Sequence, residues 1–199
     1  MSKICMVTTN PGKVASFRTV FSSYGIEIEH VDKELPEQQL TDLKEIARQK
    51  VLAAYSLITY HALVKRPVIV QDSGFYLHAW PNFPGSFVKF AFMTLGPEGV
   101  MALVEKRARE CEFRECLAYT DDGENVKFFE GTILGSVSDK PRGERSKEEW
   151  SGLWQIFVPE SYAKTIAEMN DEERASWRKT RGNNAATKFA KWFSKQGRV

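Results

Sequence analysis

The chain has 199 residues, of which 42% are hydrophobic, so it is long enough to bury a substantial core as one large domain. Its formal net charge of only +2 argues for neither a nucleic acid nor a membrane surface as a partner. No apolar run approaches the roughly 20 residues of a membrane span, and the apolar start is too short for a signal peptide, which predicts a cytoplasmic protein.

The first half of the chain alternates predicted strands and helices. Asn10 is placed to cap a helix whose first residue is Pro11, where the missing N–H costs nothing, and Gly25 suits its C-terminal stop. The apolar stripe of this helix is Val14, Phe17, Val20, Phe21 and Tyr24. The other predicted elements of this half are strands over residues 4–8, 27–31 and 67–70 and a helix over about residues 41–60.

Predicted β structure dominates the second half. Asp121-Asp122-Gly123 is a strong turn signal, which joins strands over residues 113–120 and 125–130 into a hairpin. The other predicted elements are a helix over residues 99–109, a third strand of the meander over 132–138, a polar loop over 139–152, a strand over 154–158 and a final helix carrying Ala186, Phe189, Ala190 and Phe193. Strands and helices in this order are typical of an α/β fold.

Two short segments carry the chemistry, and each follows a predicted strand, where open α/β folds place their ligands. The first, Thr8-Thr9-Asn10-Pro11-Gly12-Lys13, offers a hydroxyl, an amide and an ammonium at a helix start. Helix starts attract phosphate through their free N–H groups and partial positive charge. The segment is not a Walker loop, because Val7 stands where the leading glycine would be. The alternative is a capped helix with an exposed lysine.

The second segment, Gln71-Asp72-Ser73-Gly74-Phe75, places a carboxylate at the tip of the third predicted strand. Asp72 can bind Mg²⁺ or orient an attacking water, and its alternative is a turn aspartate that bonds the backbone of Gly74. Glu45 is a natural second carboxylate, because Mg²⁺ usually takes one or two carboxylates with phosphate oxygens. Its alternative is a capping box at the helix start. Together the segments indicate an enzyme acting on a nucleoside polyphosphate.

An ordered set of motifs covers most of the chain. Thr8-x-Asn10-x-x-Lys13 looks like an opening T-x-N-x-x-K, and Glu45-Ile46-Ala47-x-x-Lys50 looks like E-N-A-x-x-K. The other matching pieces are Leu35-Pro36-Glu37, Gln71-Asp72-Ser73-Gly74-Phe75, Phe83-Pro84-Gly85, Val88-Lys89-Phe90, Leu95-Gly96-Pro97-Glu98-Gly99, Pro141-Arg142-Gly143 and Phe157-x-Pro159. Through these pieces the chain resembles the inosine-triphosphate pyrophosphatases, also called noncanonical purine NTP pyrophosphatases.

This resemblance implies a two-lobed α/β fold around a long mixed β-sheet with flanking helices. It implies a single domain over residues 1–199, with the active cleft between the lobes, and a homodimer. Members hydrolyse nucleoside triphosphates between the α and β phosphates with Mg²⁺, giving monophosphate and pyrophosphate. The implied substrates are noncanonical purine nucleotides such as ITP, dITP and XTP.

The same resemblance gives individual residues a role. Asp72 would be the catalytic residue that orients or deprotonates the water, and Glu45 and Asp72 would hold Mg²⁺. Thr8, Asn10 and Lys13 would hold the polyphosphate. The remaining substrate-binding residues would be Ser73, Lys89, Trp154, Phe157, Lys179 and Arg181.

Four positions depart from the family's pattern. Gln71 stands where the family usually has Glu before the catalytic aspartate. Leu153-Trp154-Gln155 replaces an F/W-D-P segment that reads the purine, and Lys179-Thr180-Arg181 replaces S-H-R. Residues 144–150 look like an insertion in the exit loop. Since these losses gather on the base-binding side, hydrolysis is predicted to be retained while the base preference stays open.

Other functions compete with this prediction. One is a relative with altered base specificity, or a weakly active nucleotide-binding module. The neutral Gln71 and the lost base-reading residues support this alternative. Another is nucleic-acid binding through the basic C-terminal region, where a solvated helix face is the favoured interpretation. That region carries Arg174, Arg178, Lys179, Arg181, Lys188, Lys191, Lys195 and Arg198. The cysteines Cys5, Cys111 and Cys116 lack metal-type spacing, so reduced spectator thiols are favoured over metal or redox chemistry.

Overall fold

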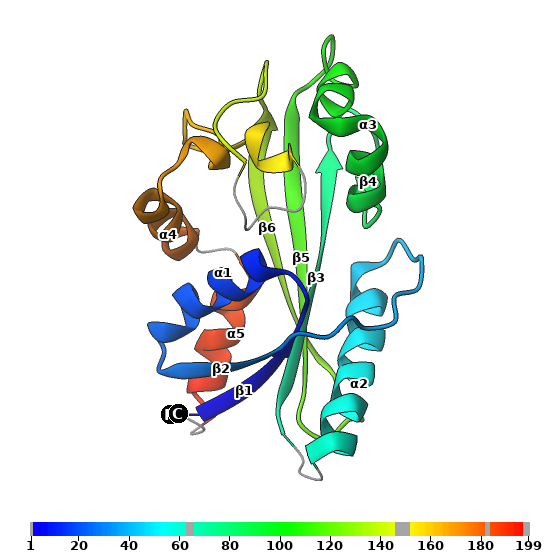
Figure 1. The fold of residues 1–199 in the computed structure, drawn as a ribbon, viewed down its shortest axis with the longest axis vertical. Coiled ribbons are helices and arrows are strands. Elements are labelled where there is room, and N and C mark those ends of the chain that lie inside the picture. Colours follow the sequence, from blue (N-terminus) through cyan, green and yellow to red (C-terminus); the bar gives the residue numbers. More distant parts are fainter. Residues whose placement is uncertain (1, 63–65, 146–151, 182–183, 197–199) are drawn as a thin grey trace. The chain divides into compact units, whose positions relative to one another are not determined.

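The computed structural model describes residues 2–62, 66–145, 152–181 and 184–196 (Figure 1). The chain divides into two compact units. Unit 1 comprises Met1–Asp72, Glu115–Gly131 and Gly182–Val199, and unit 2 comprises Ser73–Arg114 and Thr132–Arg181. The divisions after residues 72, 114 and 131 fall inside strands, so β3, β5 and β6 each contribute to both units.

The strands form a mixed sheet with the order β2-β1-β3-β5-β6-β7, and β4 pairs with β3. They are β1 (Ser2–Val7), β2 (Ile26–Val31), β3 (Val68–Leu77), β4 (Pro84–Gly85), β5 (Glu110–Thr120), β6 (Lys127–Val137) and β7 (Phe157–Pro159). β1 is parallel to β2 and β3, whereas β4 is antiparallel to β3 and β7 to β6. Parallel neighbours need crossovers, which the helices supply. The predicted class, an α/β fold with a mixed sheet and flanking helices, is confirmed.

In unit 1, alternation along β1 sends its side chains into two cores. Ile4 and Met6 pack with α1 (Pro11–Ser22) and α5 (Ala185–Ser194). Cys5 and Val7 pack with α2 (Leu43–Ala62). Figure 1 shows α1 and α5 on one side of β1 and α2 on the other. Where both faces of a strand are covered, every residue is buried, which is why residues 4–7 of β1 form a continuous apolar run.

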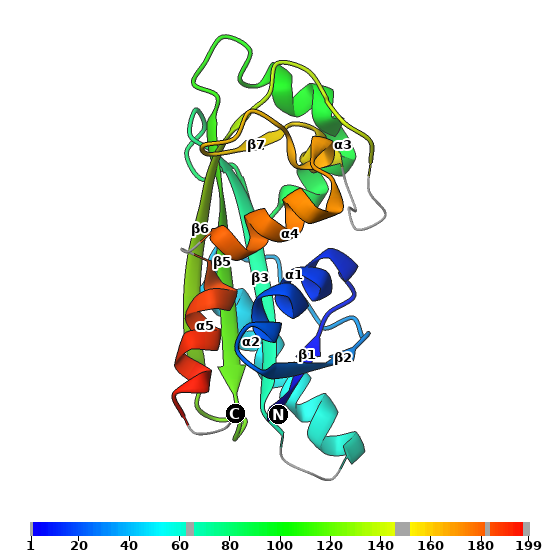
Figure 2. The same cartoon turned by 90° about the vertical axis from the view of Figure 1, so that its left-hand side faces the viewer.

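Phe189 of α5 lies at the centre of an aromatic cluster in unit 1. Its ring stacks on Phe21 of α1 with centroids 5.4 Å apart and on Phe193 at 5.2 Å. Phe129 of β6 meets it edge-on at 5.3 Å. Figure 2 shows α5 running alongside the unit 1 parts of β5 and β6. The four apolar residues predicted for this helix are all buried, so its predicted buried face is confirmed.

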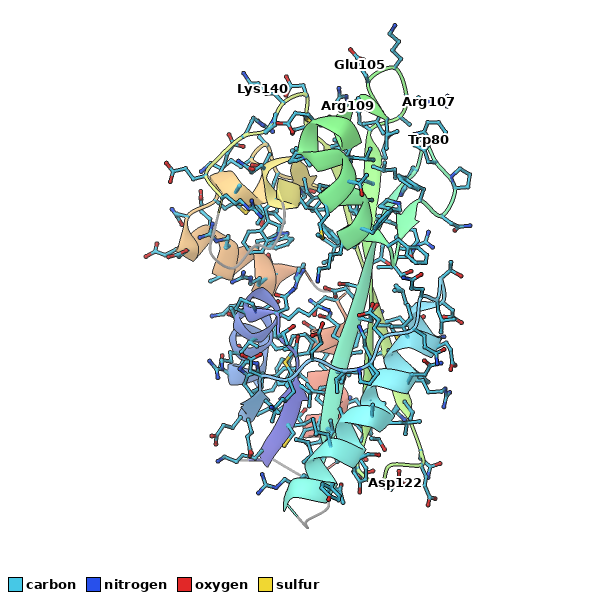
Figure 3. All side chains as sticks on the ribbon, turned by 45° about the vertical axis from the view of Figure 1, so that its right-hand side comes forward. Trp80, Glu105, Arg107, Arg109, Asp122 and Lys140 are labelled. Carbon is cyan, nitrogen blue, oxygen red and sulfur yellow. The ribbon has the colours of Figure 1, made fainter. Side chains whose placement is uncertain are left out.

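Unit 2 has a core of its own. Its helical elements are α3 (Val88–Ala102), η1 (Gly152–Gln155), η2 (Ile166–Glu168) and α4 (Asp171–Thr180). Phe75 of β3 and Phe157 of β7 are fully buried, and the ring of Phe113 of β5 lies 5.2 Å and 4.8 Å from theirs. At another edge of this unit, the Arg107 guanidinium lies 4.5 Å from the centre of the Trp80 ring, and both are labelled in Figure 3.

The predicted hairpin turn is confirmed in atomic detail. Asp122 sits between β5 and β6, and one of its carboxylate oxygens accepts hydrogen bonds from the backbone N–H groups of Glu124 and Asn125, both at 2.8 Å (Figure 3). The side chain of Asn125 donates to the other oxygen at 2.8 Å. These hydrogen bonds stabilise the charged carboxylate and hold the pKa of Asp122 well below its usual range. The bond from the Asn125 side chain has the largest effect.

Two predicted strand boundaries are wrong. β3 does not end at residue 70 but continues to Leu77, because Phe75, Tyr76 and Leu77 are buried and β4 pairs with the first two. Asp72 therefore lies within a strand, not at its tip. The strands predicted over 125–130 and 132–138 are one strand, β6. Gly131 does not interrupt it: a Cβ there would lie 2.5 Å from the Ala185 nitrogen, so glycine permits close packing against α5.

Three further predictions need correction. The helix predicted over 99–109 is the end of α3, which starts at Val88, bends at Gly96 (φ 65°) and stops at Ala102. Trp154 lies in η1, and the strand begins only at Phe157. The helix α4 was not predicted, because it is mostly polar, although Asn170 and Glu173 form the capping box that marks its start. Of the suggested insertion, residues 146–150 lie outside the described residues.

The three cysteines are buried, and burial raises the pKa of the Cys116 thiol to about 12 and that of Cys111 further still. Thiols held protonated in this way are poor nucleophiles and metal ligands, which favours their reading as spectators. No helix in the described part of the chain is long and apolar enough to cross a membrane.

Candidate active site

The loop between β1 and α1 is built around the start of a helix. The Asn10 side chain accepts a hydrogen bond from the Lys13 backbone N–H at 3.1 Å, so Asn10 is the predicted cap of α1. The Thr8 hydroxyl accepts from the Asn10 N–H at 3.1 Å. Pro11 begins the helix, as predicted. The two polar side chains and the first turn of α1 therefore lie together in unit 1, at the end of a buried strand.

Lys13 is not the exposed lysine of the alternative interpretation. Its side chain is partly buried, and its Nζ donates a hydrogen bond to the Gln71 carbonyl oxygen at 2.7 Å. Burial lowers the pKa of the Lys13 ammonium, although the negative charge of Asp72 opposes the shift. The first turn of α1 is thus tied to the residue that precedes Asp72, and the two predicted segments meet in space.

Asp72 is the buried acid of this cluster, with 7% of its surface exposed. Its Oδ1 accepts a hydrogen bond from Lys50 Nζ of α2 at 2.8 Å. The same Nζ lies 2.8 Å from Oε2 of Glu37, which belongs to the segment between β2 and α2. Burial by itself would lower the pKa of Lys50, but the charge of Asp72 and the bonds to Asp72 and Glu37 together raise it.

Glu45 lies in the first turn of α2, in the same unit. Its carboxylate accepts a hydrogen bond from Gln49 Nε2 at 3.0 Å and lies 3.8 Å from Arg48 Nε. At this helix start it is Asp42 whose side chain accepts from a backbone N–H, that of Lys44, at 2.8 Å. The contacts of Glu45 are therefore with side chains of its own helix. Such contacts at a helix surface are weak, so replacing them by a contact with a metal cation costs little free energy.

The chemistry of these donors suits a hard divalent cation. Asp72 and Glu45 offer carboxylate oxygens, which Mg²⁺ prefers to nitrogen or sulfur. Among the described residues there is no group of three or more His, Cys, Asp or Glu side chains that could hold a metal ion. A cation here would take its remaining ligands from water and from the oxygens of a polyphosphate, as Mg²⁺ commonly does.

The other predicted site residues belong to unit 2. Ser73 follows Asp72 in β3, and Lys89 is exposed at the start of α3. Trp154 is partly buried in η1, and the Arg178 guanidinium of α4 lies 5.9 Å from its ring centre. Lys179 is exposed in the last turn of α4, and Arg181 follows it, with its guanidinium 4.7 Å from the Trp177 ring centre.

Phe157, predicted to contact the substrate, is different. Its ring is fully buried in the core of unit 2, between Phe75 and Phe113. It offers no exposed surface to a ligand in this structure, so we assign it to the core.

Sequence reasoning gave no role to two residues of the cluster, Lys50 and Glu37. Both stand in recognised motifs, Lys50 in Glu45-Ile46-Ala47-x-x-Lys50 and Glu37 in Leu35-Pro36-Glu37. The available signal was helical spacing: residues five apart lie on different faces of a helix, so Lys50 projects from a different face of α2 than Glu45. The contact of Lys50 with Asp72 spans 22 positions of the chain and has no local signature.

The fold and this cluster define an α/β protein in which the start of the first helix is tied to the residue that precedes a buried, lysine-bound carboxylate on the third strand. The chain belongs to the Ham1 family, whose model matches residues 4–192. A dITP/XTP pyrophosphatase of Methanopyrus kandleri is 35% identical over 192 residues, which cover 96% of each chain. Inosine triphosphate pyrophosphatase 1 of Trypanosoma cruzi is 33% identical and covers 86% of this chain and 83% of its own.

A solved structure agrees with the fold. The HAM1 protein of Coxiella burnetii superimposes with a TM-score of 0.71 at 18% identity, over 98% of this chain and 100% of that one. The predicted family and fold class are therefore confirmed.

Proposed function

We propose that this chain is a Mg²⁺-dependent nucleoside triphosphate pyrophosphohydrolase that acts on noncanonical purine nucleotides such as ITP, dITP and XTP. The observation that carries the proposal is the similarity over 96% of the chain to a protein named dITP/XTP pyrophosphatase. The cluster of Thr8, Asn10, Lys13 and Asp72 supports it, because side chains suited to binding phosphate lie in the same unit as a buried carboxylate, and Lys13 contacts the residue beside it.

In the proposed reaction, water attacks the α-phosphorus and the bond from that phosphorus to the bridging oxygen breaks, so that monophosphate and pyrophosphate form. Asp72 orients the water and accepts its proton. Thr8, Asn10 and Lys13 hold the polyphosphate, the ammonium offsetting its charge. Asp72 and Glu45 would hold Mg²⁺, which when bound neutralises charge on the phosphate oxygens. Ser73, Lys89, Lys179 and Arg181 of unit 2 are proposed to contact the nucleotide.

We predict that Lys13→Ala raises the Michaelis constant for ITP. The factor should correspond to a loss of about 1–3 kcal/mol of binding free energy, the value of a charged hydrogen bond. A partly buried ammonium is screened less than an exposed one, so most of the loss should remain at high salt. The pKa of Lys13 is lowered, so in the unmodified chain the Michaelis constant should also rise as alkaline pH removes its proton. Steady-state kinetics across pH checks both. Lys33→Ala, at an exposed position, is the control, and equal constants for both variants would remove Lys13 from the site.

The base preference is proposed to depend on Trp154. An indole offers a stacking face and one donor, so it holds a base without testing its edge as strictly as a carboxylate would. We therefore predict that deaminated purines are preferred less strongly than is usual in the family, and that Trp154→Ala lowers kcat/KM for all purine nucleotides alike. Pyrophosphate release over the common and deaminated NTPs and dNTPs measures this. A strong preference for ITP and XTP that survives Trp154→Ala would contradict it.

The same substrate panel tests the alternatives. Release of pyrophosphate from none of the nucleotides, with tight nucleotide binding, would favour a binding module. Nucleic-acid binding is less favoured, since the Arg174 guanidinium pairs with Asp171 and Lys188 Nζ donates to the Glu130 carbonyl oxygen at 2.7 Å. We further propose a homodimer and a cytoplasmic location, which light scattering and cell fractionation would test.

A further inference from the structure

Lys50 sits between two acids that differ in their freedom to move. Its Nζ lies 2.8 Å from Asp72 Oδ1 and 2.8 Å from Glu37 Oε2. The Asp72 side chain is 9% exposed and stands within β3, whereas the Glu37 side chain is 53% exposed and stands in an irregular segment. The Lys50 side chain is 15% exposed. Asp72 is therefore the fixed partner of the ammonium, and Glu37 is the adaptable one.

The ammonium occupies one of the two Asp72 oxygens that the proposed function offers to a cation. Two like charges cannot both approach Asp72 Oδ1 closely, because their repulsion in a partly buried place is strong. Lys13 adds a second positive charge nearby, since its Nζ donates to the carbonyl oxygen of Gln71, the residue before Asp72, at 2.7 Å. For a divalent cation to bind at Asp72 Oδ1, Lys50 has to withdraw from that oxygen. Glu37 is already in contact with its ammonium and can retain it.

Resting on the proposed function, we infer that Lys50 is a positioning residue that holds Asp72 in the metal-free protein, and that Glu37 receives the Lys50 ammonium when a divalent cation binds at Asp72. Lys50 thus opposes cation binding and keeps a buried carboxylate paired in its absence. Glu37 favours cation binding without being a ligand, because it offers Lys50 a second anion. This role is distinct from those of Glu45 and Asp72, whose oxygens contact the cation.

A titration with Mn²⁺ as the probe, followed by electron paramagnetic resonance without nucleotide, tests the inference. Lys50→Met keeps the length of the side chain and removes its charge, so Mn²⁺ should bind on the order of tenfold tighter. Glu37→Gln should weaken Mn²⁺ binding several-fold, because Lys50 then has Asp72 as its remaining acid. Glu34→Gln makes the same charge change at another exposed position of the segment and should leave Mn²⁺ binding unchanged.

The double variant separates this role from direct ligation. If Glu37 acts through Lys50, Glu37→Gln should have no effect on Mn²⁺ binding in the Lys50→Met background. An equal weakening in both backgrounds would make Glu37 a ligand and overturn the inference, as would unchanged or weaker binding by Lys50→Met, or no Mn²⁺ binding by any variant. Glu37→Gln alters an exposed side chain, so its result stands even if Lys50→Met does not fold.

Pyrophosphate release from ITP by the unmodified chain is measured alongside the titration. If no pyrophosphate is released, the proposed function is rejected. The Mn²⁺ titrations of the two single variants and the double variant test the inference independently of that result.

Discussion

Asp72→Asn should lower Mg²⁺-dependent pyrophosphate release by a factor on the order of 10²–10⁴, the range typical of a lost general base. A neutral amide binds a divalent cation weakly and accepts no proton from water. The fold should survive, because the Asn side-chain oxygen can still accept the hydrogen bond that Lys50 donates to Asp72 Oδ1 at 2.8 Å. Initial rates of pyrophosphate release from ITP, with circular dichroism of both proteins, measure the effect.

Asp32→Asn is the matched control for this experiment. It makes the same chemical change at an exposed position just after β2, and it should leave the rate unchanged. A rate for Asp72→Asn within a few-fold of the unmodified chain would remove Asp72 from the chemistry, whatever became of the metal.

Phe189→Ala should lower the free energy of unfolding by about 3–5 kcal/mol, the usual cost of emptying a buried aromatic site. The ring is fully buried and touches rings from α1, β6 and its own helix, so the surrounding structure cannot close the cavity by moving one side chain. Denaturant unfolding followed by tryptophan fluorescence gives the value.

Two variants bracket this result. Phe189→Leu keeps most of the buried volume and should cost clearly less than Phe189→Ala. Lys191→Ala, at an exposed position of the same helix, should change the free energy of unfolding by no more than about 0.5 kcal/mol. A loss for Phe189→Ala as small as that for Lys191→Ala would mean that α5 does not pack on unit 1 as the structure has it.

The structure also gives a physical context to Gln71, the neutral residue beside Asp72. Its backbone carbonyl binds the Lys13 ammonium, a contact that any residue could make. The loss of a carboxylate at this position therefore leaves the link between α1 and β3 intact. What changes is the local charge, because a glutamine at position 71 adds no negative charge beside Asp72.

The sequence alone determined the elements whose signals are local. The cap at Asn10 and the turn at Asp122 each follow from a side chain that accepts a hydrogen bond from backbone within a few residues. The first helix position of Pro11 follows from its missing N–H and its fixed φ. The buried face of α5 and the apolar run of β1 follow from periodicity. The ordered motifs were enough to recognise the family, because motif order does not depend on contacts.

Only the tertiary structure decided features that depend on distant partners. β3 runs past Asp72 because β4 pairs with it, and β6 runs through Gly131 because α5 packs against the bare glycine backbone. Phe157 was predicted to contact the substrate, but its ring lies in the core of unit 2, where it packs against Phe75 and Phe113. The link from Glu37 through Lys50 to Asp72 joins a loop, a helix and a strand. Charge pairing depends on distance in space, and no local pattern of residues records that distance.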